Sequence, residues 1–507
     1  MAKMFVPISI RGDQDREMTV SILKKIETDR VYFGVNRMPF ERNDSYFAVI
    51  KDIKDQLKYY KDQGFEVCVW ISSFGYGPMP EEFNKKKGEE FTKIRSIHGD
   101  ICEDAFCPLD ENFFNMLAAQ FEDICNLGID MIMLDDDITL SQRPGIGCAC
   151  DKHLEEYRKR LGEDISLEEI PEKAFKGEGN RYRKVWLDLM GDTMRDFARK
   201  LRTVIDKINP DIRFGFCTGF TSWDLEGVDA IELSKIMAGN TKPFLRFTGA
   251  PYWAVNGRFG RMTLQTVIET VRMQYAWCKN EGVEVFTEDD CWPHNRFHTP
   301  AAVNELYDLA TRVSDDMDSL KYNFEYFSQP DYDMGYNNLH IENMPLYKKI
   351  EEVYNDKPAT GIRVYEKMRK FHEAKLADWV ESEWTIMQKA LFSHAQCLLT
   401  PHAIPTIYDG EGVCGIAFGN NIKYVPESAY DKGLIIDLKA ARYLQENGVD
   451  VGLKSSTLMH GLFLESFVDS RDDVKAHDCW NYYNLEIDPA AKVLSYYKYV
   501  DMIIRKM

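Results

Sequence analysis

The chain has 507 residues, of which 44% are apolar and 29% are charged, as in an ordinary globular protein. This composition excludes intrinsic disorder, collagen-like sequence and small disulfide-stapled folds. The net charge is −19, from 63 Lys and Arg against 82 Asp and Glu. Such a field repels polyanions, so we expect no nucleic-acid partner. At roughly 150 residues per domain the length predicts about three domains, but it also permits one α/β barrel with an appendage.

The N-terminal stretch MAKMFVPISI is too short for a secretion signal, and it leads into charges rather than a small-residue cleavage site. No run of about 18 apolar residues follows, so we expect no membrane span. The twelve Cys are therefore interpreted as mostly reduced thiols of a cytoplasmic protein. Aromatic residues make up 13% of the chain, and aromatic faces beside carboxylates favour a carbohydrate partner.

Short β-rich apolar runs alternate with longer helical segments over the first 330 residues. The expected strands lie at residues 5–10, 30–37, 66–73, 130–136, 212–218, 243–248, 283–288 and 320–327. The expected helices lie at residues 44–63, 111–127, 181–208, 264–280 and 300–317. Repeated β/α units imply right-handed crossovers and a parallel sheet. Eight such units favour a (β/α)8 TIM barrel over an open doubly wound sheet.

The pattern changes after residue 330. We interpret residues 331–394 as a mostly helical extension of the barrel. Residues 395–507 are expected to form a smaller α/β domain, whose strands and helix lie at residues 403–409, 433–437 and 438–446. A last strand begins near residue 492, so we interpret this domain as incomplete.

The fourth predicted strand ends in three consecutive carboxylates, Asp135, Asp136 and Asp137. Strand side chains alternate between two faces, so not all three can point into the barrel mouth, where the C-terminal strand ends meet. Crowding should raise the pKa of at least one carboxyl group, as a general acid requires. The alternatives are helix capping with one buried structural Asp, or a divalent metal site.

A second acidic motif, TEDDCWPHNR over residues 287–296, ends the seventh predicted strand. It combines Glu288 with the side chains of Trp292 and His294. An acidic surface loop is the alternative, but the apolar strand before Glu288 disfavours it. Strands four and seven end on opposite walls of one barrel mouth, and a glycosidase needs carboxylates on both sides of the scissile bond.

These motifs resemble the clan of barrel glycoside hydrolases that includes the family 42 β-galactosidases. That clan places the acid/base after strand four and the nucleophile after strand seven. The resemblance implies Asp137 at the acid/base position, Asp136 where the family has Asn, and Glu288 as nucleophile. It covers residues 1–330, and residues 395–455 resemble the family's flavodoxin-like trimerisation domain more weakly. We therefore expect a homo-oligomer, a dimer or trimer.

Two departures from the family's motif leave the stereochemical course of the reaction open. Asp137 is one methylene shorter than Glu, and Asp136 removes the expected amide. A wider carboxylate gap favours inversion through a positioned water, or through phosphate as in the related galacto-N-biose phosphorylases. The expected function is a glycoside hydrolase cleaving a small oligosaccharide or glycoside. An inverting glycoside phosphorylase, a metal-dependent barrel enzyme and a non-catalytic sugar-binding barrel are the alternatives.

A Cys-rich motif follows the fourth strand. Cys148, Cys150 and His153, with Cys107 upstream, form a sulfur and nitrogen set that suits a structural zinc. The resemblance also implies a Cys-bound zinc at this place. The alternative is a set of buried packing thiols. No other cofactor is expected.

Substrate-binding residues are expected at the remaining strand ends. Trp253 and Trp292 are interpreted as sugar platforms. Arg37 and Arg246 are interpreted either as ligands for an anionic substrate group or as neutralisers of the acidic cluster. The full set is Asn36, Arg37, Trp70, Arg246, Trp253, Trp292, His294 and Tyr326.

Overall fold

The structure is a computed structural model, and the chain divides into two compact units, Met1–Cys414 and Gly415–Met507. No helix in the part of the chain that the structure describes is long and apolar enough to cross a membrane. The described residues are 2–11, 14–35, 38–75, 85–141, 145–255, 262–295, 297–315, 317–324, 327–354, 357–382, 385–386, 392–460, 463–468, 473–474 and 481–499.

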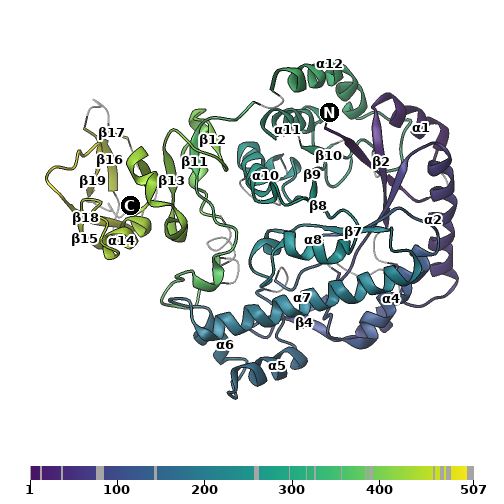
Figure 1. The fold of residues 1–507 in the computed structure, drawn as a ribbon, viewed down its shortest axis with the longest axis horizontal. Coiled ribbons are helices and arrows are strands. Elements are labelled where there is room, and N and C mark those ends of the chain that lie inside the picture. Colours follow the sequence, from purple (N-terminus) through teal and green to yellow (C-terminus); the bar gives the residue numbers. More distant parts are fainter. Residues whose placement is uncertain are drawn as a thin grey trace, which may run out of the picture. The chain divides into compact units, whose positions relative to one another are not determined.

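Eight parallel strands form a closed barrel, and they neighbour one another in chain order (Figure 1). The pairing of Phe5 with Leu320 closes the first strand on the last. The predicted (β/α)8 barrel is therefore confirmed. The strands are β1 (Met4–Ser9), β2 (Thr28–Val35), β3 (Glu66–Ile71), β6 (Met131–Leu134), β7 (Arg213–Cys217), β8 (Phe244–Arg246), β9 (Glu284–Asp289) and β10 (Asp318–Lys321).

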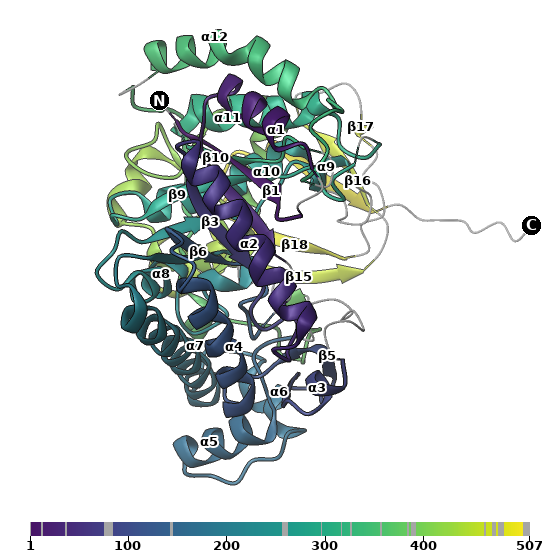
Figure 2. The ribbon, with the colours of Figure 1, turned by 90° about the vertical axis from the view of Figure 1, so that its right-hand side faces the viewer.

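Helices connect the strands and cover the outside of the barrel (Figure 2). The longest, α7, begins and ends where the sequence predicts and buries Trp186, Met190 and Met194. The main helices are α1 (Arg16–Lys25), α2 (Asp44–Asp62), α4 (Glu111–Cys125), α7 (Arg181–Ile208), α8 (Ala230–Ala238), α10 (Leu264–Cys278), α11 (Ala301–Asp315) and α12 (Tyr336–Tyr354). Shorter elements in the loops are α3 (Lys85–Glu89), β4 (Lys93–Arg95), β5 (Ile101–Phe106), α5 (Asp151–Leu161), α6 (Glu169–Ala174) and α9 (Tyr252–Val255).

Alternate side chains of the strands fill the barrel interior. Phe286 packs edge to face on Phe5, with ring centroids 5.2 Å apart, and stacks on Phe244. Because the side-chain period of a strand is two residues, this packing fixes which later residues reach the mouth. The buried interior residues include Phe5, Tyr32, Cys68, Met131, Met133, Cys217, Phe244, Phe286, Leu320 and Tyr322.

Two buried charges fasten residues 370–374 to the barrel helices. The Arg183 guanidinium, at the start of α7, donates to the carbonyl oxygens of Ala174 and Phe371 at 2.8 and 3.3 Å, and also to that of Ala374. Burial lowers the pKa of Arg183 to about 10. The Asp224 carboxylate accepts from the backbone N–H groups of Lys370 and Phe371 at 2.9 and 2.8 Å. Backbone groups therefore satisfy both charges.

The segment after the barrel contains less helix than predicted. Helix α12 ends at Tyr354, and β11 (Ile362–Val364) then pairs in parallel with β12 (Thr406–Ile407). The expectation of a mostly helical segment is therefore wrong for residues 357–382. Pro358 and Gly361 explain the difference, because both residue types disfavour a helix interior.

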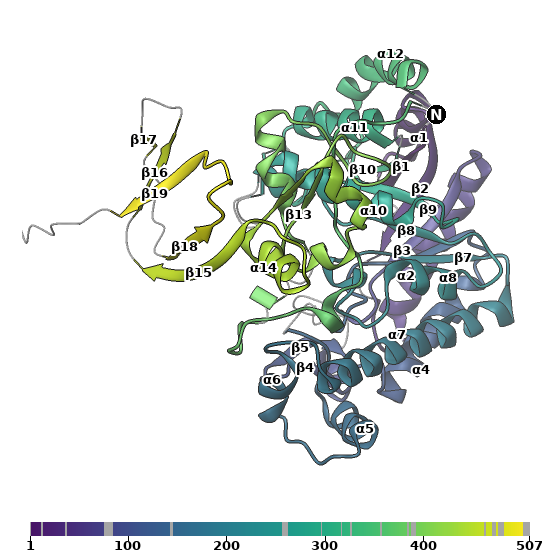
Figure 3. The same cartoon turned by 60° about the vertical axis from the view of Figure 1, so that its left-hand side comes forward.

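The second unit begins with two parallel strands and a helix, and the second strand and the helix correspond to those predicted at residues 433–437 and 438–446. Strands β13 (Gly415–Ala417) and β14 (Leu434–Ile436) are parallel, and α14 (Leu438–Glu446) has its predicted bounds. Antiparallel strands follow, of which only the last was predicted (Figure 3). They are β15 (Leu453–His460), β16 (Phe463–Phe467), β17 (Asp473–Val474), β18 (Asn481–Ile487) and β19 (Ser495–Tyr499).

Candidate active site

The strand alternation sends five side chains into the barrel mouth. Each lies two residues beyond an interior side chain of its strand; Glu288, for example, follows Phe286. One residue comes from each of five strands, so the mouth is surrounded by functional groups. These residues are Trp70, Asp135, Arg246, Glu288 and Tyr322.

Arg246 joins two acidic strand ends. Its Nη1 contacts Glu288 Oε1, and its Nη2 lies 3.5 Å from Asp135 Oδ1. The guanidinium carbon lies 6.0 Å from the ring centroid of Trp70. Only 1% of Arg246 is exposed. The structure thus brings Glu288, Arg246 and Trp70 together, as expected for mouth residues.

The environment of Glu288 favours its protonated form. Burial raises the pKa of Glu288, and the neighbouring carboxylates Asp290, Asp136 and Asp135 raise it further. The Arg246 guanidinium opposes them. One cation therefore faces four carboxyl groups among the described residues of this cluster.

Asp137 points away from this cluster, toward the loop after β3. Its two carboxylate oxygens accept from the backbone N–H of Ser73 at 2.9 and 2.8 Å, from Ser73 Oγ at 3.0 Å and from Gly75 N–H at 2.7 Å. Asp137 is 2% exposed. Donors of this kind stabilise the ionised carboxylate, whereas a general acid must hold a proton. This geometry disfavours the predicted acid role of Asp137.

The Asp136 carboxylate affects the pKa values of groups in the barrel mouth. Its carboxylate contributes to the raised pKa values of both Glu288 and Tyr252. Unlike Asp137, it is partly exposed. Its backbone N–H donates to Asp135 Oδ1 at 2.9 Å. Asp135 and Asp136 are thus the two carboxylates of the triad that are partly exposed.

Glu226 anchors the loop that follows the triad and was not predicted. Its carboxylate accepts from Thr139 Oγ1 at 2.6 Å and from the backbone N–H groups of Leu140 and Ser141 at 3.0 and 3.1 Å. It is 1% exposed, and burial raises its pKa. Glu226 lies 85 to 87 residues from these partners, so no local pattern connects them.

Aromatic rings line one side of the mouth. The ring of Tyr252 lies 6.1 Å from that of Trp292 and 6.2 Å from that of Trp253. Trp253 also packs on Phe220, 5.3 Å away. Such amphipathic rings suit a sugar, whose C–H groups stack while its hydroxyl groups form hydrogen bonds.

His294 packs deep in the mouth between two rings. It stacks on Tyr322 at 5.3 Å with an interplanar angle of 10°, and Phe327 lies 4.5 Å away. Its Nε2 lies 3.0 Å from Asp290 Oδ1. Asp290 belongs to the acidic motif predicted over residues 287–296. Three other predicted binding residues, Asn36, Arg37 and Tyr326, lie outside the described residues.

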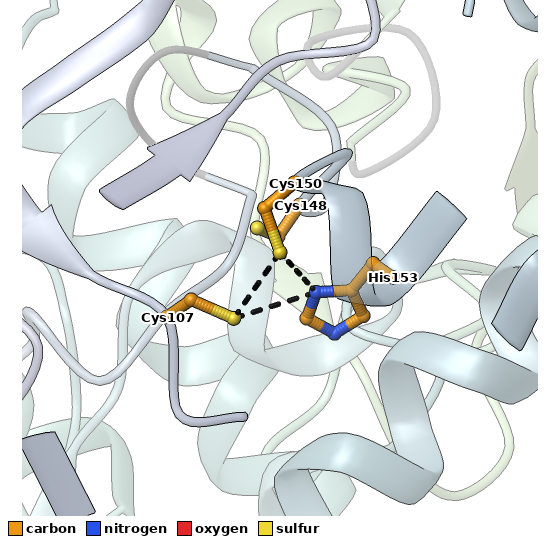
Figure 4. Close-up of side chains that lie close together, drawn as sticks. All are labelled: Cys107, Cys148, Cys150 and His153. Atoms are coloured by element: carbon orange, nitrogen blue, oxygen red, sulfur yellow. Dashed lines mark hydrogen bonds between the residues drawn. The ribbon is translucent and has the colours of Figure 1, made fainter. Parts of the chain in front are cut away.

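The structure brings the four predicted zinc ligands together (Figure 4). All four ligand atoms lie within 4.8 Å of one another, and all four residues are buried. Cys107 Sγ lies 3.6 Å from Cys150 Sγ and 3.4 Å from His153 Nδ1. Sulfur ligands at 2.3 Å from a tetrahedral zinc are about 3.8 Å apart, so the donor set and spacing fit this ion.

A hydrogen bond orients the imidazole of this cluster. Thr193 Oγ1 donates its proton to the carbonyl oxygen of Leu189 at 2.9 Å, so it accepts from His153 Nε2–H at 3.1 Å. A proton on Nε2 leaves the Nδ1 lone pair of the neutral ring facing the sulfurs. Such a partner behind a ligating histidine is typical of metal sites.

The closed parallel barrel is a fold that this chain shares with solved glycoside hydrolases. Among solved structures, the β-galactosidase of the psychrophilic Marinomonas ef1 has a TM-score of 0.57 at 11% identity, over 98% of this chain and 86% of that one. The β-galactosidase of Halorubrum lacusprofundi has a TM-score of 0.59 at 11% identity, over 98% and 83%.

A family 42 β-galactosidase from G. stearothermophilus has a TM-score of 0.56 at 13% identity, over 97% of this chain and 81% of that one. No protein-family model matches the chain, and no curated protein matches it. The predicted remote resemblance to this clan is therefore confirmed at the level of the fold.

Proposed function

We propose that this chain is a glycoside hydrolase that cleaves a small oligosaccharide or glycoside at the barrel mouth. One observation carries the proposal: acidic side chains from β9 and from the end of β6 meet across the mouth of a barrel shared with glycosidases. Paired carboxylates at this position are what glycosidic bond cleavage requires. The β-galactosidases of like fold point to a glycoside as substrate.

In the proposed mechanism Glu288 is the nucleophile, or the base for an attacking water. Asp136 is the proton donor to the leaving oxygen, because Asp135 contacts Arg246 and Asp137 is held by backbone donors. Glu288 must be ionised for its role, and Arg246 opposes the rise in its pKa. Trp292, Trp253 and His294 bind the sugar.

A panel of aryl glycosides, with proton NMR of the first-formed product anomer, tests the proposal and reports retention or inversion. Asp136→Asn is expected to lower kcat by about 100-fold or more on natural leaving groups. On an activated leaving group, which needs little protonation, the loss should be small. Asp137→Asn is the matched control for the loss of one negative charge in the same turn.

The proposed acid is overturned if Asp137→Asn shows this leaving-group dependence and Asp136→Asn does not. The hydrolase proposal is overturned if no glycoside is cleaved while calorimetry shows that sugars bind. Cleavage that requires added inorganic phosphate would instead identify a phosphorylase.

A metal-dependent barrel enzyme is the weaker candidate. Among the described residues, Cys107, Cys148, Cys150 and His153 form the one group whose ligand atoms converge as metal binding needs. Activity that survives dialysis against EDTA distinguishes a metal-independent glycosidase from this alternative.

We propose a structural zinc at that Cys and His group. Cys107, Cys148, Cys150 and His153 would hold it, and a four-ligand site of this kind stabilises a fold rather than activating water. The homo-oligomer and the cytoplasmic location expected from the sequence also remain proposals, and light scattering of the purified protein tests the oligomer.

A further inference from the structure

We infer that Arg246 is a positioning residue, which fixes Glu288 and Asp135 across the mouth and keeps Glu288 in its reactive orientation and charge state, rather than binding substrate. The inference rests on the proposed function, and it goes beyond the two interpretations from the sequence, in which Arg246 binds an anionic substrate group or neutralises the acidic cluster. It depends on four observations: burial, backbone anchoring, charge and the shape of the guanidinium group.

Burial removes Arg246 from substrate. Its side chain is 1% exposed and lies near Cys217, Glu288 and Tyr322. Trp70 covers the guanidinium from β3. Glu288 and Asp135 already lie against its two terminal nitrogen atoms.

The backbone of Arg246 is fixed by both neighbouring strands. Its carbonyl oxygen accepts from Thr218 N–H at 2.8 Å, on the β7 side. The next residue, Phe247, donates its N–H to the carbonyl oxygen of Phe286 in β9 at 2.9 Å. Phe286 lies two residues before Glu288. Arg246 and Glu288 therefore extend from neighbouring strands that the same ladder of backbone hydrogen bonds joins. The backbone hydrogen bonds thus align Arg246 with Glu288, and the guanidinium contact then holds the two side chains together.

The charges around Arg246 show what it does there. Titratable groups lie around it on several strands: Glu288 on β9, Asp135 and Asp136 after β6, Cys217 on β7 and Tyr322 after β10. All of these groups are either neutral or negative. Among the described residues of this set, Arg246 supplies the positive charge that stabilises an ionised Glu288 against burial and like charges.

Shape explains why an arginine is present. The planar fork of Arg246 reaches Glu288 with Nη1 and Asp135 with Nη2. A lysine ammonium is a single point of charge, and it cannot hold two carboxylates in a fixed plane in the same way. Arg246→Lys should therefore keep the charge but lose the spacing.

The test measures the titration of Glu288 directly, by NMR of protein labelled with ¹³C at the Glu side-chain carboxyl carbon; comparison with Glu288→Gln assigns the signal. We expect the Glu288 titration to move to higher pH in Arg246→Met and by less in Arg246→Lys. Arg213→Met, which removes a guanidinium paired with Glu284 at the other end of the barrel, is the matched control and should leave it unchanged.

Kinetics separate positioning from binding. Arg246→Lys is expected to lower kcat by about 100-fold with KM nearly unchanged, since the contact is used in the reaction rather than in substrate capture. A raised KM with an unchanged kcat would make Arg246 a binding residue and overturn the inference. So would an unchanged Glu288 titration in both variants.

Arg246→Met leaves the buried Glu288 and the partly exposed Asp135 without their cation, and it is the variant most prone to misfold. Arg246→Lys keeps the measurement available in that case. The NMR readout needs no substrate, so it reports on Arg246 even if no glycoside is cleaved and the proposed function fails.

Discussion

Glu284 and Glu288 lie four residues apart on β9 and point into the same barrel, yet they lie in opposite environments. Glu284, at the N-terminal end, lies 2.9 Å from Arg30 Nη1 and 3.1 Å from Arg213 Nη2. Although burial opposes it, these two guanidinium groups lower the pKa of Glu284. Glu288, at the C-terminal end, has one arginine and several carboxylates around it, and its pKa is raised.

The two ends of β9 therefore serve different purposes: the N-terminal end stabilises the barrel, and the C-terminal end holds groups that can react. At the N-terminal end the charges are paired, so the site stabilises the barrel and needs no ligand. At the mouth the negative charge exceeds the positive charge among the described residues, which costs stability and leaves groups available for reaction. In TIM-barrel enzymes the C-terminal end of the strands carries the active site, which agrees with this division.

Replacing each glutamate separately gives the largest expected effect and tests the comparison most directly. Glu288→Gln should lower kcat by a factor on the order of 10³ or more, because it removes a reacting carboxylate. Glu284→Gln should leave kcat unchanged but lower the free energy of unfolding by about 3 kcal/mol, because Arg30 and Arg213 lose their shared partner. Steady-state kinetics and urea unfolding of both variants measure this.

Equal losses of kcat in the two variants would contradict the division between the two ends. So would a normal kcat in Glu288→Gln on the best substrate of the panel.

The Cys and His cluster extends the comparison to the outside of the barrel. Cys107→Ser should reduce bound zinc from one equivalent to less than about a tenth and lower the unfolding free energy by several kcal/mol. Metal analysis and urea unfolding measure both effects. Cys125→Ser, a buried cysteine of α4 outside the cluster, is the control and should retain the metal.

Because the proposed zinc is structural, its loss should leave the Glu288 titration unchanged in protein that is still folded. A shifted Glu288 titration would show that the cluster influences the active-site carboxylates rather than only the stability of the fold.

The pH dependence of stability gives the smallest expected effect. Glu288 has a raised folded pKa, so its contribution to stability is present below its unfolded pKa of about 4.3 and is lost as the pH rises through the folded value. Glu284 has a lowered folded pKa, so its contribution is present above the unfolded pKa and is lost as the pH falls through the folded value. A tenfold difference in proton affinity between the folded and unfolded chain corresponds to about 1.4 kcal/mol of stability.

Urea unfolding over a pH series therefore gives opposite trends for the two variants. Relative to the native chain, Glu288→Gln should become more stable as the pH rises above about 4.3, whereas the destabilisation caused by Glu284→Gln should diminish in acid. Parallel trends would show that both carboxyl groups titrate alike.

The barrel could be predicted from the sequence because its signals are local. Each strand is an apolar run of a few residues, and helices such as α7 show their periodicity within the segment itself. The prediction for the segment after Tyr354 was wrong because it relied on charged residues at helical spacing and gave no weight to Pro358 and Gly361, which disfavour a helix interior.

Only those features of the site that follow from local sequence signals could be predicted. The positions of Glu288 and the Asp triad follow from strand ends, whereas the roles within the triad depend on distant partners. Asp137 meets Ser73 and Gly75, which lie 64 and 62 residues away. Strand alternation starting from Met133 would assign both Asp135 and Asp137 to the barrel interior. The two separate because the strand ends at Leu134 and the bonds to Ser73 and Gly75 turn Asp137 away, which no local pattern shows.

The Arg183 guanidinium also has a practical consequence for anyone who wishes to express the barrel alone. Residues 371 and 374 supply two of its acceptors, so a chain shortened near residue 330 would retain the cation inside the protein and lose part of its surroundings. The shortened chain would be less soluble even though every barrel strand was intact. A shortened version should therefore extend past residue 374, where the last of these acceptors lies.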